Sequence, residues 1–424
     1  MEKLEKSVPV IRFKGFSEAW EQRKFEDCFN FPVSTNSLSR VMLNYDKGEV
    51  KNVHYGDVLI KYPCILNIKK EEIPYITGGC LEAYNSNLLE NGDLIFADAA
   101  EDETVGKAVE VNGITNENLV SGLHTIVARA TTQKAKYFLG YYINSDIYHR
   151  QLLRLMQGSK VSAISKGNLQ KTDVSFPKDI EEQQKIGSYF KKLDSTIALH
   201  QHKLDTLKQM KKGFSQQIFP ENDRKKPKIR FNSFCEEWEQ RKIGEYGYFY
   251  YGKSAPKWSV TQDATTPCVR YGELYTKFGP EIDIVHSYTN IDKSNLKFSS
   301  GNEVLVPRVG ENPLDFANCS WLSLSNVAIG EMISVYNTEQ YPLFIAYYFR
   351  SKMKYEFAKR VEGGNVSNLY YSYLEDILIS VPSIDEQKKI AEFLNKIDIT
   401  INLLQNKLDR IKELKKAYLQ NMFI

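Results

Sequence analysis

The chain has 424 residues, of which 42% are hydrophobic and 26% charged, values ordinary for a soluble globular protein of two or three domains. Its net charge is only +3, whereas a free-standing DNA binder is usually more basic, so either the positive charge is local or partner subunits share the phosphate contacts. No apolar run is long enough to span a membrane and the start lacks a secretory signal, so we expect a cytoplasmic protein with no membrane partner. The six cysteines form no C-x-x-C pair and the histidines no metal-binding pattern, so no metal site is predicted.

The first recognisable element is a short head that occurs twice. IRFKGFSEAWEQRKF at Ile11–Phe25 recurs as IRFNSFCEEWEQRKI at Ile229–Ile243, with ten of fifteen positions identical at an offset of 218. Two copies within one chain can be compared directly. Segments that are shared must do the same job twice, whereas segments that differ have drifted or do two different jobs.

The first variable segment, residues 26–173, mixes strand-like apolar runs with turns. The predicted strands lie at Gly56–Ile60, Gly92–Asp98 and His124–Ala130. An aromatic amphipathic helix follows at Lys136–Met156, then a glycine-led turn at Gly158–Ser162. Basic and aromatic residues interleave in its loops, where lysines could bind phosphate or base edges. The predicted DNA-binding residues of this segment are Lys61, Lys69, Lys70 and Lys160. Each lysine taken singly fits a solvated surface charge better, and only the lysines taken together indicate DNA binding.

A long helix is predicted over the block Glu182–Phe219, which follows the sequence VSFP at Val174–Pro177. Its apolar residues alternate steps of four and three, which gives a seam suited to coiled-coil packing. The seam residues are Ile186, Phe190, Leu193, Ile197, Leu204 and Leu207. His200 and Lys211 interrupt the seam; the histidine is expected to face solvent or a polar partner. About 35 residues at about 1.5 Å each give a helix on the order of 50 Å long.

A polar linker at residues 220–228 leads into the second head and the second variable segment, residues 244–378. This segment repeats the plan of the first, with strand-like runs at Asn302–Asn312 and Asn326–Tyr336, an aromatic helix at Leu343–Val361 and a turn at Gly363–Ser367. Its predicted DNA-binding residues are Lys253, Lys257, Arg270, Arg308 and Asn365.

One stretch of the second variable segment, Gly247–Ser254, matches the P-loop expression G-x-x-x-x-G-K-[ST]. A phosphate cradle needs exposed backbone N–H groups in a tight loop that opens a helix. Four aromatic residues fill this stretch and Pro256 follows, with no amphipathic helix after it. We therefore expect no nucleotide site here.

The chain ends in a second helical block, Glu386–Phe423, preceded by ISVP at Ile379–Pro382. At an offset of 204, 18 of 38 positions are identical to the first block. Its seam residues are Ile390, Leu394, Ile397, Ile401, Leu408 and Ile411, and Lys415 repeats the interruption at Lys211. The equal lengths favour antiparallel pairing of the two helices over two separate dimerisation arms. The repeated lysine indicates either register control or a surface for another protein.

Taken together, the heads with W-E-Q-R-K, the paired E-Q-x-K-I helices and their ordered repetition resemble the specificity subunit of type I restriction-modification systems. The resemblance covers nearly the whole chain and rests on the order of the motifs, since no single motif is specific. It implies an α+β fold with an internal pseudo-two-fold repeat, in which two α/β-mixed target-recognition domains are joined by an antiparallel coiled coil. The expected parts are a first recognition domain with its head (1–173), a spacer helix (174–219), a linker (220–228), a second recognition domain (229–378) and a second spacer helix (379–424).

The resemblance also implies a function for each part. Each recognition domain would read one half of a split site in double-stranded DNA, and the helices would set the spacer and dock two modification subunits. Those subunits would hold S-adenosylmethionine, and restriction subunits would add ATP- and Mg-dependent cleavage, while this chain would bind no cofactor and carry no catalytic residue. Two alternatives remain open from the sequence: a self-contained nucleotide-using DNA-modifying enzyme, and a coiled-coil scaffold with two ligand-binding heads.

Overall fold

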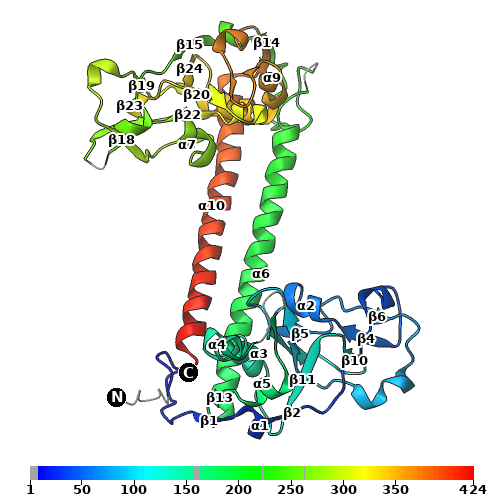
Figure 1. The fold of residues 1–424 in the computed structure, drawn as a ribbon. Coiled ribbons are helices and arrows are strands. Elements are labelled where there is room, and N and C mark those ends of the chain that lie inside the picture. The colour runs from blue at the N-terminus through cyan, green and yellow to red at the C-terminus, as the bar shows by residue number, and fades with distance from the viewer. Residues whose placement is uncertain (1–7, 157–161, 222–223, 262) are drawn as a thin grey trace. The chain divides into compact units, whose positions relative to one another are not determined.

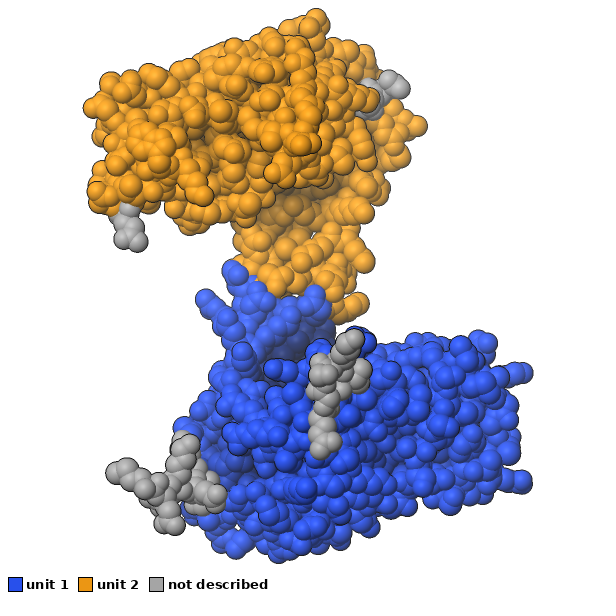
Figure 2. All heavy atoms as spheres, viewed as in Figure 1, with its two compact units in different colours: residues 1–201, 406–424 blue, residues 202–405 orange. Residues whose placement is uncertain are grey.

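The computed structural model describes residues 8–156, 162–221, 224–261 and 263–424. The chain forms two compact units (Figure 2): unit 1 comprises residues 1–201 and 406–424, and unit 2 comprises residues 202–405. Each unit therefore contains one variable segment, part of its own long helix and part of the long helix from the other repeat. Figure 1 shows the elements of each unit by label.

Unit 1 is built on two sheets whose strands are short and largely buried. The five-stranded sheet has the order β2 (Phe29–Asn30), β11 (Thr125–Ala130), β7 (Leu94–Ala97), β9 (Ala108–Asn112), β5 (Ile65–Asn67). The four-stranded sheet has the order β10 (Asn118–Ser121), β4 (Val50–Val53), β6 (Tyr75–Ile76), β3 (Leu43–Asn44). Two strand pairs complete it, β1 (Glu21–Lys24) with β13 (Asp173–Phe176) and β8 (Ala99–Ala100) with β12 (Ser162–Ala163). Its helices are α1 (Phe25–Cys28), α2 (Tyr55–Ile60), α3 (Phe138–Ile143), α4 (Asp146–Leu155), α5 (Lys166–Gln170) and the first part of α6 (Ile180–Gln217).

Unit 2 repeats this plan. Its five-stranded sheet has the order β15 (Gly247–Tyr251), β24 (Ile333–Thr338), β20 (Glu303–Pro307), β22 (Ser320–Leu322), β17 (Glu281–Ile282). Its four-stranded sheet has the order β18 (Ser287–Thr289), β16 (Thr266–Val269), β23 (Ser325–Ile329), β19 (Phe298–Ser300). Smaller sheets pair β14 (Glu239–Lys242) with β27 (Leu378–Val381), and β21 (Val309–Gly310) with β26 (Ser367–Asn368) and β25 (Glu362–Gly363). Its helices are α7 (Tyr271–Thr276), α8 (Pro342–Lys352), α9 (Lys354–Ala358) and the first part of α10 (Ile384–Asn421).

Each head is joined to a long helix by a strand pair and by an ion pair. The E-Q-R-K sequence of each head is a strand, and it pairs antiparallel with the strand that leads into the long helix. Arg12 donates two hydrogen bonds, of 2.6 and 2.8 Å, to the buried carboxylate of Glu182 at the start of α6. Arg230 and Glu386 make the same pair in unit 2, at 2.8 and 2.7 Å. The repeated arginine and glutamate therefore anchor each head.

The two long helices pack antiparallel within each unit, which confirms the predicted fold class. In unit 1, Tyr189 of α6 contacts Tyr418 of α10 with ring centres 5.4 Å apart, whereas the next residue, Phe190, stacks on Phe423 at 5.6 Å. In unit 2, Phe214 of α6 contacts Phe393 of α10 at 5.1 Å. All twelve predicted seam residues are buried or half-buried.

The lysines that interrupt the seam are paired inside the helix interface. In unit 1, Lys415 forms an ion pair with Asp194, which also accepts a 2.7 Å hydrogen bond from the Tyr141 hydroxyl. In unit 2, Lys211 pairs with Asp398, which accepts from the Tyr347 hydroxyl, also at 2.7 Å. Opposite charges at one place along each seam favour a single register. Of the two interpretations of these lysines, the structure therefore supports register control.

One strand prediction and two helix predictions were wrong. Gly56–Ile60 was expected to be a strand but lies in helix α2, because the buried His54 caps the turn by accepting a 3.2 Å hydrogen bond from Gly56 N–H. The two aromatic helices are each broken into two, at Asn144–Ser145 and at Met353. His200 is half-buried and its Nδ1 is buried without a hydrogen-bond partner among the described residues, so its expected orientation toward solvent or a polar partner stays a prediction.

Candidate nucleic-acid interface

In unit 2, three predicted DNA-binding residues meet around one glycine turn, Gly330–Met332, between β23 and β24. Lys253 N–H donates to Ile329 O at 2.9 Å, and Arg308 N–H donates to Met332 O at 3.1 Å. Gly330 N–H donates at 2.9 Å to Val269 O, in the residue just before Arg270. The turn thus holds the backbones of Lys253, Arg270 and Arg308 in one place, although they lie far apart in sequence.

Unit 1 has the same turn, Gly122–His124, between β10 and β11, with the same three backbone hydrogen bonds. Asn36 N–H donates to Ser121 O at 3.1 Å, Gly122 N–H to Val53 O at 2.9 Å, and Asp98 N–H to His124 O at 3.0 Å. Asn36, His54 and Asp98 are therefore the counterparts of Lys253, Arg270 and Arg308. We call these six residues the turn-facing positions.

The backbone of this turn is matched in the two units, whereas the side chains are not. Unit 2 places three cations at the turn-facing positions, and unit 1 places an amide, an imidazole and a carboxylate. A shared glycine is required at the first turn position, because a Cβ there would lie 2.9 Å from Val53 O in unit 1 and 3.0 Å from Val269 O in unit 2. The turn is thus a common platform that carries different polar groups.

Arg308 is held by aromatic rings. Its guanidinium carbon lies 4.5 Å from the ring centre of Tyr251 and 5.7 Å from that of Tyr370. Tyr251 in turn packs against Tyr371, which stacks on Phe249, with ring centres 4.6 and 5.6 Å apart. Burial raises the pKa of Tyr251, and the nearby Arg308 charge partly opposes that shift. The aromatic run of β15 therefore supports an arginine.

The structure of Gly247–Ser254 is not that of a P-loop. Gly247–Tyr251 is strand β15, paired along its length with β24, so its N–H groups belong to a sheet. Lys253 points its ammonium at Ser294 O, 3.5 Å away. The first helical turn afterwards is the three-residue 3-10 turn Lys257–Ser259. A strand followed by no α-helix cannot cradle a phosphate chain.

In unit 1, Asp98 contacts a histidine instead of tyrosines. One Asp98 carboxylate oxygen lies 3.2 Å from Nδ1 of His124, whose ring packs edge-on against Tyr55 at 5.2 Å. Burial raises the pKa of Asp98, and His124 lowers it in part. Burial also lowers the pKa of the neighbouring His54. Where unit 2 places the donor Arg308, unit 1 therefore places the acceptor Asp98.

The other predicted DNA-binding residues are spread more widely and stay predictions. Lys61 is occupied, donating to Glu72 O at 2.7 Å. Lys69 and Lys70 are exposed and line a cavity of about 360 Å³ together with Lys136. Lys257 and Asn365 are exposed, and Asn365 lies in the turn between β25 and β26. Lys160 lies outside the described residues.

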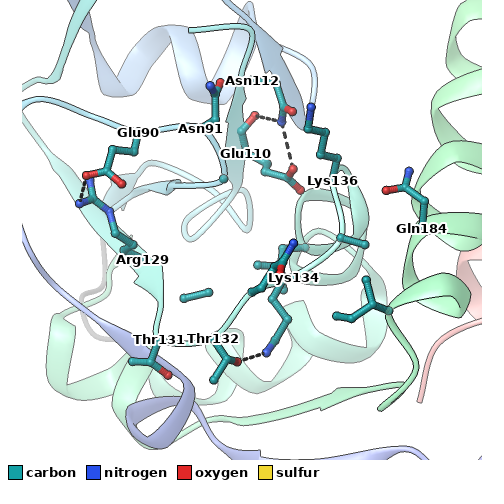
Figure 3. Close-up of a pocket in the computed structure, with 16 residues that line it drawn as sticks. Glu90, Asn91, Glu110, Asn112, Arg129, Thr131, Thr132, Lys134, Lys136 and Gln184 are labelled. Carbon is teal, nitrogen blue, oxygen red and sulfur yellow. Dashed lines mark hydrogen bonds and ion pairs between the residues drawn. The ribbon is translucent and has the colours of Figure 1, made fainter. Parts of the chain in front are cut away.

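Unit 1 has a cavity of about 510 Å³ beside β9 and the start of α3 (Figure 3). Its charged groups are mostly occupied: Arg129 binds Asp93 and Glu90. Glu110 accepts backbone hydrogen bonds from Tyr137 and Gly140, at 2.7 and 2.8 Å, and so caps α3. Burial raises the pKa of Glu110. We interpret these contacts as structural.

Sequence reasoning missed three of the six turn-facing positions, although a signal was available. Val53-His54-Tyr55-Gly56 and Val269-Arg270-Tyr271-Gly272 repeat at an offset of 216, inside segments whose sequences otherwise diverge. The repeat contains the valine whose carbonyl accepts from the glycine turn and the cap residue of α2 or α7. Comparing the variable segments motif by motif would have paired His54 with Arg270.

Among the residues that the structure describes, no group of three or more His, Cys, Asp or Glu could hold a metal ion. Within the same residues, no helix is long and apolar enough to cross a membrane.

Comparison with known proteins identifies the family. The sequence profile described as "Type I restriction modification DNA specificity domain" matches residues 18–209 and 235–413, which is most of the chain and both repeats. The chain belongs to the type I restriction-modification specificity family. It is a specificity subunit, the component that recognises the DNA sequence.

Relatives of this specificity subunit match over more than nine-tenths of their lengths. The putative type I restriction enzyme MjaX specificity subunit of Methanocaldococcus jannaschii is 23% identical over 417 residues, covering 94% of this chain and 91% of the relative. The crystal structure of the S subunit from M. genitalium superposes with a TM-score of 0.60 at 10% identity, covering 98% and 99% of the two chains. A chain from a structural study of type I R-M complex assembly and conformational transition gives 0.50 at 15% identity, covering 95% and 97%. These structures share the fold.

Proposed function

We propose that this specificity subunit reads a bipartite, asymmetric DNA site, with one half read by each unit. The observation that carries the proposal is the glycine turn, whose backbone hydrogen bonds match in the two units while its side chains do not. Equal backbones would present two readers in equivalent ways, whereas different donors and acceptors would select different bases. The low net charge fits a chain that shares phosphate contacts with partner subunits.

The long helices have the properties of a spacer. Each unit ties its reading domain to α6 or α10 through the buried arginine–glutamate pair and the paired head strand. The seam lysines and aspartates favour one register of the two helices. A stiff element holds the separation of two readers better than a loop does.

Exposed apolar residues at equivalent positions of the helices support two identical modification subunits as partners. Leu199 and Leu403, which are related by the offset of 204, are 52% and 64% exposed. Met210 and Leu414, related by the same offset, are 48% and 44% exposed. Each unit thus presents one leucine from its own helix and one apolar residue from the other. Repeated exposed apolar groups on a helix are typical of a protein interface.

In this proposal the chain itself performs no chemical step. Methyl transfer from S-adenosylmethionine to adenine belongs to the modification subunits, and ATP- and Mg-dependent cleavage belongs to the restriction subunits. The contribution of this chain is to place those subunits on the correct sequence.

The test is the methylated motif produced by the complete complex. Cells that carry the chain and its modification subunits should methylate adenines in a split motif, and exchange of residues 26–173 for those of another specificity subunit should change one half only. Changes in both halves would contradict two independent readers, and ATP turnover by the isolated chain would support an enzyme instead.

Two further variants test the helices. Seven extra residues inserted at matched places in α6 and α10 lengthen each helix by about 10.5 Å. The spacer of the motif should then grow by about three base pairs, at about 3.4 Å per pair; an unchanged spacer would exclude a ruler. Leu199→Asp and Leu403→Asp should each remove one modification subunit in native mass spectrometry, and the double variant both. A scaffold without this role would keep its subunits.

A further inference from the structure

Arg308 is an unusual arginine in this chain, because its charge has no counter-charge. Among the residues for which the structure gives a placement, it makes no ion pair and no side-chain hydrogen bond. Its Nε is buried without a hydrogen-bond partner, so a ligand cannot reach the guanidinium from that side. The two terminal nitrogens are not buried and make no hydrogen bond, so they are the guanidinium donors that a ligand can reach. The buried unpaired Nε costs stability, whereas the two accessible terminal nitrogens are free to donate to a ligand.

The surroundings hold this fork in one orientation. Tyr251 and Tyr370 flank it, and the chain of rings through Tyr371 and Phe249 fixes Tyr251. The Arg308 backbone is fixed on both sides, since its N–H donates to Met332 O and its carbonyl accepts from Leu369 N–H at 2.8 Å. A planar cation packed on aromatic rings loses little further freedom when it binds. Such a group suits recognition of a planar edge carrying two acceptors.

We propose that Arg308 reads a guanine in the half-site of unit 2, donating both terminal nitrogens to the acceptor edge of that base. The inference rests on the proposed function, because it names the base contact made by one of the two readers. Guanine is the base whose major-groove edge carries two acceptors, and a forked arginine matches it.

Asp98 holds the equivalent position in unit 1 and has the opposite chemistry. Its carbonyl accepts from Ile164 N–H at 2.9 Å, as Arg308 accepts from Leu369, so the two backbones match on both sides. Ser34 and Ser165 stand at the positions equivalent to Tyr251 and Tyr370. Unit 1 therefore lacks the two rings that pack on the arginine in unit 2. A carboxylate accepts hydrogen bonds, and the base edges that donate are the amino groups of cytosine and adenine. Position 98 therefore selects an amino-bearing base where position 308 selects guanine.

The experiment measures base preference in the intact complex. The chain is co-expressed with its modification subunits over a plasmid library randomised across the wild-type motif, and methylated adenines are sequenced. Arg308→Ala should reduce the preference for guanine at one position of one half-site by roughly 5- to 150-fold, the range expected for a bidentate base contact. The other half-site should not change. Asp98→Asn should change preference at one position of that other half only.

Two variants separate a base contact from other roles. Arg308→Lys keeps the charge but loses the fork, so the guanine preference should fall while overall methylation stays close to that of the wild type. Arg360→Ala removes an arginine bound to Glu356 and should leave every base preference unchanged. If Arg308→Ala lowers methylation of all sequences equally, Arg308 binds phosphate and the inference is overturned; an unchanged motif overturns it too. Should Arg308→Ala not assemble, the preference measured on Arg308→Lys decides. A wild-type complex without any split motif would instead contradict the proposed function.

Discussion

The Arg12–Glu182 pair gives the clearest test of how the heads are held. Glu182 is 1% exposed and its carboxylate receives both hydrogen bonds from one guanidinium, whose side chain is 12% exposed. Arg12→Ala removes the partner and leaves a buried charge without compensation. The cost of such a change is about 3–5 kcal/mol, far above the value of about 0–1 kcal/mol for a surface pair. We therefore expect a large loss of stability confined to unit 1.

Hydrogen exchange measured by mass spectrometry localises this loss. Amides of β1 and β13, which join the head to α6, should exchange roughly two to three orders of magnitude faster in Arg12→Ala. Adding Glu182→Gln should recover part of the loss, because the buried group is then neutral. Arg230→Ala is the matched control and should act on β14 and β27 in unit 2. Unchanged exchange in both single variants would refute the view that these pairs anchor the heads.

Three other changes test the seam, the turn and the cavity. Lys415→Glu should destabilise unit 1 by about 1–3 kcal/mol in thermal unfolding, since both partners are only about a quarter exposed, and the reversed pair with Asp194→Lys should recover much of it. Gly330→Ala should cost about 1–3 kcal/mol, because its Cβ would meet a backbone carbonyl at 3.0 Å, whereas Gly272→Ala, with open space around it, should not. Burial raises the pKa of Glu110 above 4.5, so the folded chain keeps that proton to higher pH than the unfolded one. As the pH falls from neutral towards 4.5, the melting temperature of the wild type should therefore rise relative to that of Glu110→Gln. An equal pH dependence of the two melting temperatures would contradict this.

The parts of the fold that repeat were predictable from the sequence, because two copies expose what is shared. The seam spacing predicted both long helices and their pairing, and the repeated heads predicted a common frame. Residues 56–60 could not be assigned correctly, since a buried histidine cap decides for helix over an apolar run that also suits a strand. Arg308 was predicted as a basic loop residue, but its ring clamp depends on Tyr251 and Tyr370, which lie 57 and 62 positions away in sequence. Contacts over such separations leave no local pattern.

The last residues of the chain complete the unit that is synthesised first. Phe423 packs against Trp20, Phe138 and Phe190 in the core of unit 1, with ring centres 6.4, 6.0 and 5.6 Å away. The corresponding residue of unit 2, Phe219, is already present when the segment that it packs against emerges from the ribosome. Every residue of unit 2 is translated before residue 406, so the residues of unit 2 are all present in the chain while unit 1 still lacks residues 406–424. Translation order and completion order are therefore reversed, and a chain that stops before residue 406 keeps every residue of the second unit but lacks Phe423 in the core of the first.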